Sequence, residues 1–232
     1  MSQNTIYSAE QQNLNRFISK TFMWMIAGLL ISAVSAFFVI NNPVILRFVY
    51  GSRFGVFALM IVQMILAYTL RPNPEKMENS SAYIAKFTAY SFLTGITFAV
   101  IALVYTTTSI VQAFVTTAAL FAILAIYGYT TKRDLTKLGN ILLPALLGLI
   151  VLSVINMFIG STGMSFVLTV VTVVIFVGLT MYDMQKIKVY YLYFEHATHL
   201  HASLAISCAL ELYLDFINLF LSVLRLFGTR RD

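Results

Sequence analysis

Seven continuous apolar stretches alternate with short polar connections along the chain. They cover residues 21–40, 54–70, 82–105, 109–130, 141–160, 164–183 and 202–227. Each is close to the roughly 20 residues that an α-helix needs to cross the hydrocarbon core of a bilayer. Because the stretches are continuous and do not alternate with period two, they do not fit the strands of a membrane β-barrel. The pattern predicts an all-α membrane protein built as a bundle of seven transmembrane helices.

The connections indicate how the predicted helices are arranged. Residues 106–108 and 161–163 are very short uncharged connections, so the helices that they join should be antiparallel neighbours. The charged connections are residues 71–81, 132–137 and 186–201, and none is large enough for a second folded domain. We expect a cytoplasmic N-terminal segment (residues 1–20), one transmembrane domain (residues 21–228) and a short C-terminal tail (residues 229–232).

Composition agrees with a membrane protein and excludes several other classes. The chain is 59% hydrophobic and 10% charged, whereas soluble domains have about 45–50% and about 25%. Its single cysteine, Cys208, cannot form an intramolecular disulfide, and no Cys/His cluster suits zinc. The net charge of +6 comes from bases scattered between apolar segments. We therefore expect a lipid bilayer as a partner, and no nucleic acid.

The basic residues also predict orientation. Ten lie on the side of the N-terminus and five on the other side. The first group is Arg16, Lys20, Arg71, Lys76, Lys86, Lys132, Arg133, Lys137, Lys186 and Lys188, and the second is Arg47, Arg53, Arg225, Arg230 and Arg231. Because cytoplasmic loops carry the excess of Lys and Arg, the N-terminus is predicted in the cytoplasm and the C-terminus outside.

Few ionisable residues fall within the predicted spans. Asp183 ends the sixth stretch, and Glu211 and Asp215 lie in the seventh. Such residues cost several kcal/mol in a bilayer, so each is a functional hypothesis. At about 100° per residue, the polar residues of the last stretch fall within a sector of about 120°. They are Ser203, Ser207, Glu211, Asp215, Asn218, Ser222 and Arg225; a second polar stripe holds Ser165, Thr169, Thr172, Thr180 and Asp183.

The Ser and Thr residues of these stripes have an ordinary interpretation as helix–helix hydrogen bonds. A carboxylate in mid-span requires a proton or a counter-charge. If Asp215 lies near Asp183, the pair can share a proton and titrate as one unit, and when ionised it offers hard oxygens suited to Ca²⁺. We therefore predict a pH sensor or gate and a Ca²⁺ site at Asp183 and Asp215, with Ser207, Glu211 and Asn218 as a candidate ion pathway. Glu211 either adds an oxygen to that pathway or lies at its aqueous mouth.

Arg71 and the histidines are less specific. Arg71 closes the second stretch on the same predicted side as Asp183, either as a positive-inside anchor or as a latch that pairs with one aspartate. His196, His199 and His201 do not have the spacing of a closed metal site, and we expect them to be solvated loop residues; the alternative is a contribution to pH sensing.

No catalytic set is visible, and we expect no enzymatic activity. The chain lacks an H-E-x-x-H motif, a nucleophile elbow and a phosphate-binding glycine loop. An intramembrane aspartyl protease also uses two aspartates on neighbouring helices. Tyr182 and Asp183 match half of that pattern, but Asp215 lies in Tyr-Leu-Asp-Phe, without the glycine of the other half.

Four segments resemble a known family. TMYDMQKIK (residues 180–188) and LYLDFINLF (residues 212–220) are similar to the two signature segments of the Bax-inhibitor-like family of transmembrane proteins. GYTTKRDL (residues 128–135) and TGIT (residues 94–97) resemble its bacterial branch, and the likeness extends over residues 21–228. Met184 stands where a threonine is common, and residues 54–70 lack the acidic residue that some members carry there.

The resemblance implies a seven-helix bundle with the last helix central, in the bacterial cytoplasmic (inner) membrane. It implies that Asp183 and Asp215 are the pH-sensing pair and that Arg71 is their latch. The activity it implies is a pH-sensitive calcium leak channel, with Ca²⁺ as transported ion and no cofactor. One bacterial branch is linked to a membrane protease, so the alternative is a non-conducting regulator that binds such a protease or another membrane complex.

Overall fold

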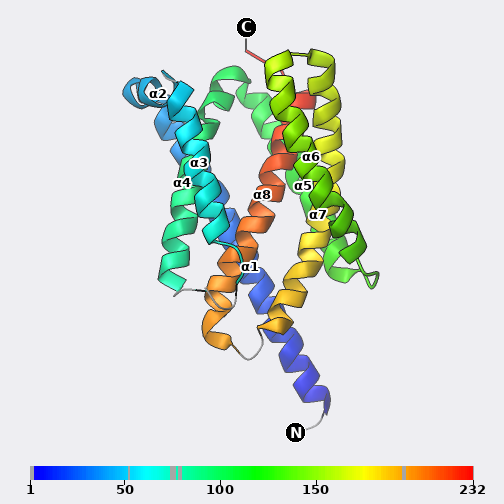
Figure 1. Ribbon diagram of the computed structural model, residues 1–232. Helices are drawn as coiled ribbons and strands as arrows, with labels where there is room; N and C mark the ends of the chain where they lie inside the picture. Colours follow the sequence, from blue (N-terminus) through cyan, green and yellow to red (C-terminus); the bar gives the residue numbers. More distant parts are fainter. Residues whose placement is uncertain (1–2, 52, 74–76, 78–79, 195–196, 232) are drawn as a thin grey trace. The chain divides into compact units, whose positions relative to one another are not determined.

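The computed structural model describes residues 3–51, 53–73, 77, 80–194 and 197–231, without the side chains of residues 3–9, 53 and 54. Lys76 and His196, which enter the predictions above, lie outside the described residues, as does the side chain of Arg53. Described residues are almost entirely helical, so the all-α prediction is confirmed (Figure 1). The helices are α1 (Gln3–Ile40), α2 (Pro43–Tyr50), α3 (Arg53–Thr69), α4 (Ser80–Val104), α5 (Thr107–Thr130), α6 (Thr136–Ile159), α7 (Thr162–Tyr193), the 3₁₀ turn η1 (Thr198–Leu200) and α8 (His201–Phe227).

The number of candidate spans agrees with a membrane bundle. Six of these helices, α1 and α4 to α8, are long and apolar enough to cross a bilayer. With 17 residues α3 is at the short end of that range, and it forms a pair with α2 that is bent by 83°. By length and composition the described chain therefore has six candidate spans, or seven if the bent pair counts as one. Helix α2 was not predicted; Asn42 caps it by accepting hydrogen bonds from the N–H groups of Val44 and Ile45, just before Pro43 at its start.

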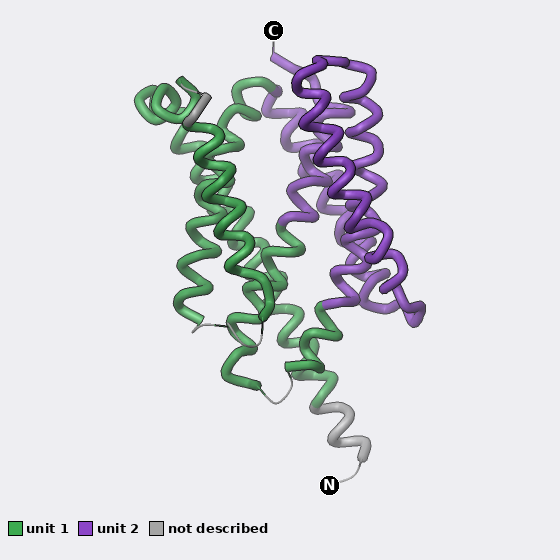
Figure 2. Tube along the Cα trace, in the orientation of Figure 1, with its two compact units in different colours: residues 1–104, 187–213 green, residues 105–186, 214–232 purple. Residues whose placement is uncertain are grey.

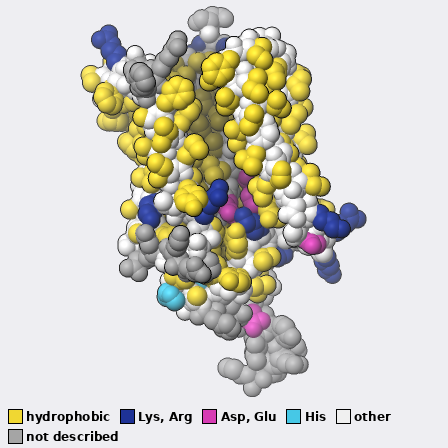
Figure 3. Space-filling view, viewed as in Figure 1, with side chains coloured by type: hydrophobic (Ala, Val, Ile, Leu, Met, Phe, Trp, Pro, Cys, Tyr) yellow, Lys and Arg dark blue, Asp and Glu magenta, His cyan; other side chains and the backbone are white. Residues whose placement is uncertain are grey.

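The surface has the polarity of a protein that contacts lipid. Apolar side chains cover most of the visible surface of each compact unit (Figure 3). Large ones are strongly exposed, for example Phe37 at 71%, Phe48 at 84% and Phe158 at 81%. Helix α8 is the exception, since 72% of its most apolar stretch is buried, against 17–33% in the other candidate spans. Such burial is expected of a central helix.

The chain divides into two compact units (Figure 2). The first, Met1–Val104 and Ile187–Tyr213, holds α1 to α4, the end of α7 and the first half of α8. There α1 and α4 approach so closely that a side chain on Gly95 would overlap the Ser32 carbonyl oxygen. The Ser32 hydroxyl lies 2.7 Å from the carbonyl of Ser91 and 2.7 Å from the hydroxyl of Tyr213. Because a carbonyl only accepts, Ser32 donates to it and Tyr213 donates to Ser32, which joins α1, α4 and α8.

The second unit is Tyr105–Lys186 and Leu214–Asp232, with α5, α6, most of α7 and the second half of α8. Aromatic contacts join α8 to α5, because the Phe216 ring lies 5.4 Å from Phe114 and 5.5 Å from Phe121. The C-terminal tail is bound to the start of α5. Thr229 accepts a hydrogen bond from the Thr106 N–H at 3.1 Å and donates one to Ser109 Oγ at 2.9 Å.

Helix α7 corrects one prediction. It continues past Asp183 to Tyr193, so Asp183 lies inside a helix and not near its end, and the connection expected at residues 186–201 is confined to residues 194–200. The extension is amphipathic. Its buried residues Ile187 and Tyr191 have i, i+4 spacing, and the buried Phe194, directly after the helix, continues the series at i+7. Lys186 and Lys188, on either side of Ile187, interrupt the apolar run, which is why hydropathy alone ended the helix too early.

Candidate functional site

Asp183 has a counter-charge on its own helix. Lys186, one turn later in α7, places its Nζ 3.8 Å from Asp183 Oδ1. The Asp183 side chain is 13% exposed and that of Lys186 is 23% exposed. The same ammonium lies 5.9 Å from the centre of the Tyr182 ring. From the sequence Arg71 is the expected basic partner of an aspartate, whereas the structure shows that Lys186 is a basic partner of Asp183.

Two glycines fix the position of this part of α7. A side chain on Gly128 of α5 would overlap the backbone carbonyl of Met181, and one on Gly139 of α6 would overlap the Tyr182 ring. The backbones of α5 and α6 therefore lie directly against the turn that carries Asp183. Asp183 cannot move along the bundle unless these two contacts change.

Gln185 ties the same turn of α7 to the loop before α6. Its Oε1 accepts a hydrogen bond from the Leu135 N–H at 2.8 Å, and its Nε2 donates one to the Arg133 carbonyl at 2.8 Å. A side-chain amide that is bonded at both ends satisfies two backbone groups of a loop. Two of the segments that resemble the family, residues 128–135 and 180–188, are thus in contact.

Asp215 is the most buried ionisable carboxylate of the predicted site. It is 3% exposed, in the middle of α8. Further along the same stripe, Asn218 donates to the Leu214 carbonyl at 2.7 Å and Ser222 donates to the Asn218 carbonyl at 2.7 Å. These donors are therefore engaged within α8 itself. Asp183 and Asp215 belong to the same compact unit, and a direct pairing of their carboxyls stays a prediction.

Three threonines of the polar stripe on α7 form hydrogen bonds within their own helix. Thr169, Thr172 and Thr180 each donate to the carbonyl four residues earlier, at 2.7 Å. These threonines therefore do not donate the helix–helix hydrogen bonds that the sequence predicts. Ser165 differs, since it accepts a hydrogen bond from Asn156 of α6 at 2.7 Å.

The first half of α8 carries the remaining candidate pathway residues. Ser207 is 1% exposed, and its hydroxyl has no hydrogen-bond partner among the residues that the structure describes. Glu211, one turn later, is half-buried. A buried hydroxyl without a partner costs about 1–3 kcal/mol, and the role of Ser207 in an ion pathway stays a prediction.

Arg71 and the histidines complete the predicted set. Arg71 is exposed, with its guanidinium 5.6 Å from the centre of the Tyr68 ring, and it belongs to the first unit. Its ion pair with an aspartate stays a prediction. His199 is exposed as expected, but His201 is half-buried, with its ring 5.3 Å from Tyr191, so the solvated-loop prediction is wrong for it. Among described residues no group of three or more His, Cys, Asp or Glu side chains could hold a metal ion.

Sequence reasoning missed two positioning residues. Gln185 lies two residues after Asp183, and its only signal was a polar amide within the segment that resembles the family. Tyr213 is fully buried and precedes Asp215 by two residues. A tyrosine in mid-span needs a partner for its hydroxyl, but nothing in the sequence identifies Ser32 as that partner.

Known proteins match this chain over nearly its whole length. The family described as "Inhibitor of apoptosis-promoting Bax1" matches residues 14–232. The inner membrane protein YbhL of Escherichia coli is 38% identical over 219 residues, which cover 94% of this chain and 93% of YbhL. A Borreliella burgdorferi protein is 41% identical over 94% of each chain, and YrjE of Lactococcus lactis is 39% identical over 97% of this chain and 95% of its own.

Proposed function

Since the chain belongs to the Bax inhibitor-like family of membrane proteins, we propose that it is a pH-sensitive cation leak channel that conducts Ca²⁺. In this proposal Asp183 and Asp215 form the gate. The observation that carries it is the burial of Asp215, 3% exposed in the middle of the most buried span. An ionised side chain at such depth costs about 2.5–3.5 kcal/mol on insertion scales. A function in ion conduction would explain why the chain keeps a carboxylate at this depth despite that cost.

Protonation supplies the pH sensitivity. Two nearby carboxyls titrate together, so a change of pH alters the net charge of the pair by whole units. Lys186, 3.8 Å from Asp183, gains or loses its attraction as that charge changes. Arg71 is the second proposed counter-charge, and competition between the two bases would couple proton binding to movement of α7 and α8.

The ligand count favours conduction over storage of Ca²⁺. Calcium takes six to eight oxygen ligands, and two carboxylates supply at most about four. Among the described residues no group of three or more His, Cys, Asp or Glu side chains could hold a metal ion, so neutral oxygens of the protein or water would complete the shell. Weak, partly hydrated binding is what passage through a pore requires, because a tightly held ion would not leave.

Flux measurements test the proposal. We expect purified protein in liposomes that enclose a Ca²⁺-sensitive dye to admit Ca²⁺ faster than empty liposomes, at a rate that changes with pH. Asp215→Asn should abolish the pH dependence. No flux above that of empty liposomes, together with recovery of a membrane protease in a pull-down, would overturn the channel in favour of a non-conducting regulator.

Asp134→Asn is the matched control. Asp134 is an exposed carboxylate in the loop before α6. The hydroxyl and N–H of Thr136 donate to it, the latter at 2.8 Å, and with Lys137 they lower the pKa of the Asp134 carboxyl. It therefore stays ionised through the neutral range. The control removes the same charge and should leave the pH dependence of the flux unchanged.

A further inference from the structure

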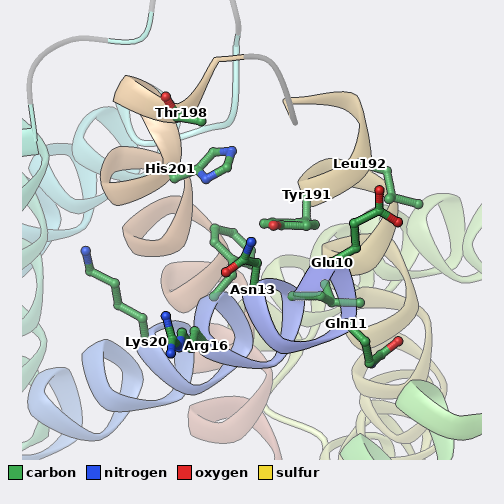
Figure 4. A pocket seen from close by; sticks show the side chains of 11 residues that line it. Glu10, Gln11, Asn13, Arg16, Lys20, Tyr191, Leu192, Thr198 and His201 are labelled. Carbon is green, nitrogen blue, oxygen red and sulfur yellow. The ribbon is translucent and has the colours of Figure 1, made fainter. Parts of the chain in front are cut away.

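A pocket of about 810 Å³ lies in the first unit, where the start of α1 meets the end of α7 and the start of α8 (Figure 4). None of the residues of the proposed gate lines it. It is therefore distinct from the site described above and calls for its own explanation.

The floor of the pocket is a packed aromatic cluster. Phe17 is 5% exposed, and its ring lies 5.2 Å from Tyr191 and 6.1 Å from His201. The His201 Nε2 donates a hydrogen bond to the Phe194 carbonyl oxygen at 3.0 Å. These contacts hold three segments of the chain in place. The pocket is thus preformed and does not depend on a single loop.

The pocket walls carry more positive than negative charge. Arg16 and Lys20 are one turn apart on α1 and line the same side of the pocket, and neither forms an ion pair with a residue that the structure describes. Glu10, the one acidic lining residue, lies on the far side from Lys20 in Figure 4. Figure 4 also shows Asn13, Tyr191 and His201 around the common space. Two permanent cations and several neutral donors suit an anion with several acceptor oxygens.

We propose that this pocket binds the phosphate group of an anionic ligand. Two sources share this chemistry, the headgroup of an anionic lipid and a soluble phosphate ester. The position favours the lipid, because Lys20 directly precedes the first apolar stretch and Leu192, on the rim, is 62% exposed. Basic pockets between helices at the cytoplasmic end of spans are suited to lipid headgroups.

Trp24 provides the measurement, since it is the only tryptophan and lies one turn after Lys20 on α1. The full chain is reconstituted with phosphatidylcholine and increasing amounts of phosphatidylglycerol that carries brominated acyl chains, which quench nearby tryptophan. We expect brominated phosphatidylglycerol to quench at a lower mole fraction than brominated phosphatidylcholine. Arg16→Gln/Lys20→Gln should weaken the preference about fivefold for each charge removed.

Lys132→Gln/Arg133→Gln is the matched control, since it removes one lysine and one arginine from an exposed loop on the same predicted side. It should retain the preference. Glu10→Gln should increase the preference, a gain that misfolding does not produce. Equal quenching by both lipids in the unchanged protein, retention of the preference in Arg16→Gln/Lys20→Gln, or an equal loss in the control would each overturn the proposal.

A soluble arm separates the two sources. Glycerol phosphate at millimolar concentration, added to the same vesicles, should compete with brominated phosphatidylglycerol if the phosphate alone is recognised. Undiminished quenching would assign the site to a lipid, because acyl chains then contribute to binding. Either outcome supports phosphate recognition if Arg16→Gln/Lys20→Gln loses the preference for brominated phosphatidylglycerol.

Discussion

The two aspartates of the proposed gate differ in their surroundings. Asp183 is 13% exposed and lies beside the ammonium of Lys186, whereas Asp215 is 3% exposed in the middle of α8. An ionised carboxylate costs more free energy the more deeply it is buried in a span, so Asp215 needs the stronger functional reason of the two. Asp215 is therefore the residue whose substitution should affect gating most.

Gln185 is the residue that we expect to fix the loop against α7. Gln185→Leu removes both of its hydrogen bonds and leaves the Leu135 N–H and Arg133 carbonyl without them, so the free energy of unfolding should fall by about 1–2 kcal/mol. Hydrogen exchange at the Leu135 amide should accelerate. Gln185→Glu keeps the acceptor for Leu135 and should protect that amide better than Leu does. Equal exchange in the two variants would contradict the assignment.

The sequence identified candidate site residues where a charged side chain falls in an apolar segment, because burying a charge costs free energy. Asp183, Glu211 and Asp215 stand out because an apolar segment rarely contains a carboxylate. Gln185 and Tyr213 do not stand out, since an amide or a phenol is tolerated near the end or in the interior of a span. Their partners, Arg133 and Ser32, are distant in sequence and only the folded chain brings them together.

Close backbone contact is what holds α5 to α7. Gly128→Ala should push these helices apart, because its Cβ would overlap the Met181 carbonyl. We expect a loss of about 1–3 kcal/mol in the free energy of unfolding, as in other overpacked cores. Gly148→Ala in α6 is the control. It meets no atom within 4 Å and should be neutral or stabilising, because alanine favours helix by about 1 kcal/mol over glycine. Equal losses in thermal unfolding would refute the contact.

At the scale of elements, continuous apolar runs located the long helices well, since each predicted stretch overlaps one observed helix. The errors fall where polarity changes within a helix. Helix α7 continues through Lys186 and Lys188 because a buried face follows the helical period. Helix α2 has only eight residues, too few to be recognised as a span, although Asn42 and Pro43 mark its start.

At the scale of the whole molecule, the membrane topology depends on whether α2 and α3 together cross the membrane. Seven spans place the two ends of the chain on opposite sides, and six place them on the same side. We expect Gln12→Cys to react with an impermeant maleimide only after permeabilisation, and Arg230→Cys to react in intact spheroplasts, both in a Cys208→Ser background. Labelling of both cysteines from one side would exclude the seven-span topology.

The most direct test of the proposed gate is the pH dependence of Ca²⁺ flux in liposomes that contain the protein, Asp183→Asn, Asp215→Asn or the double variant. If the aspartates act as one titrating unit, each single substitution abolishes most of the pH dependence and the double variant loses little more. If the flux keeps its pH dependence in Asp215→Asn, or if the two substitutions reduce it independently and additively, the coupled di-aspartate gate is wrong.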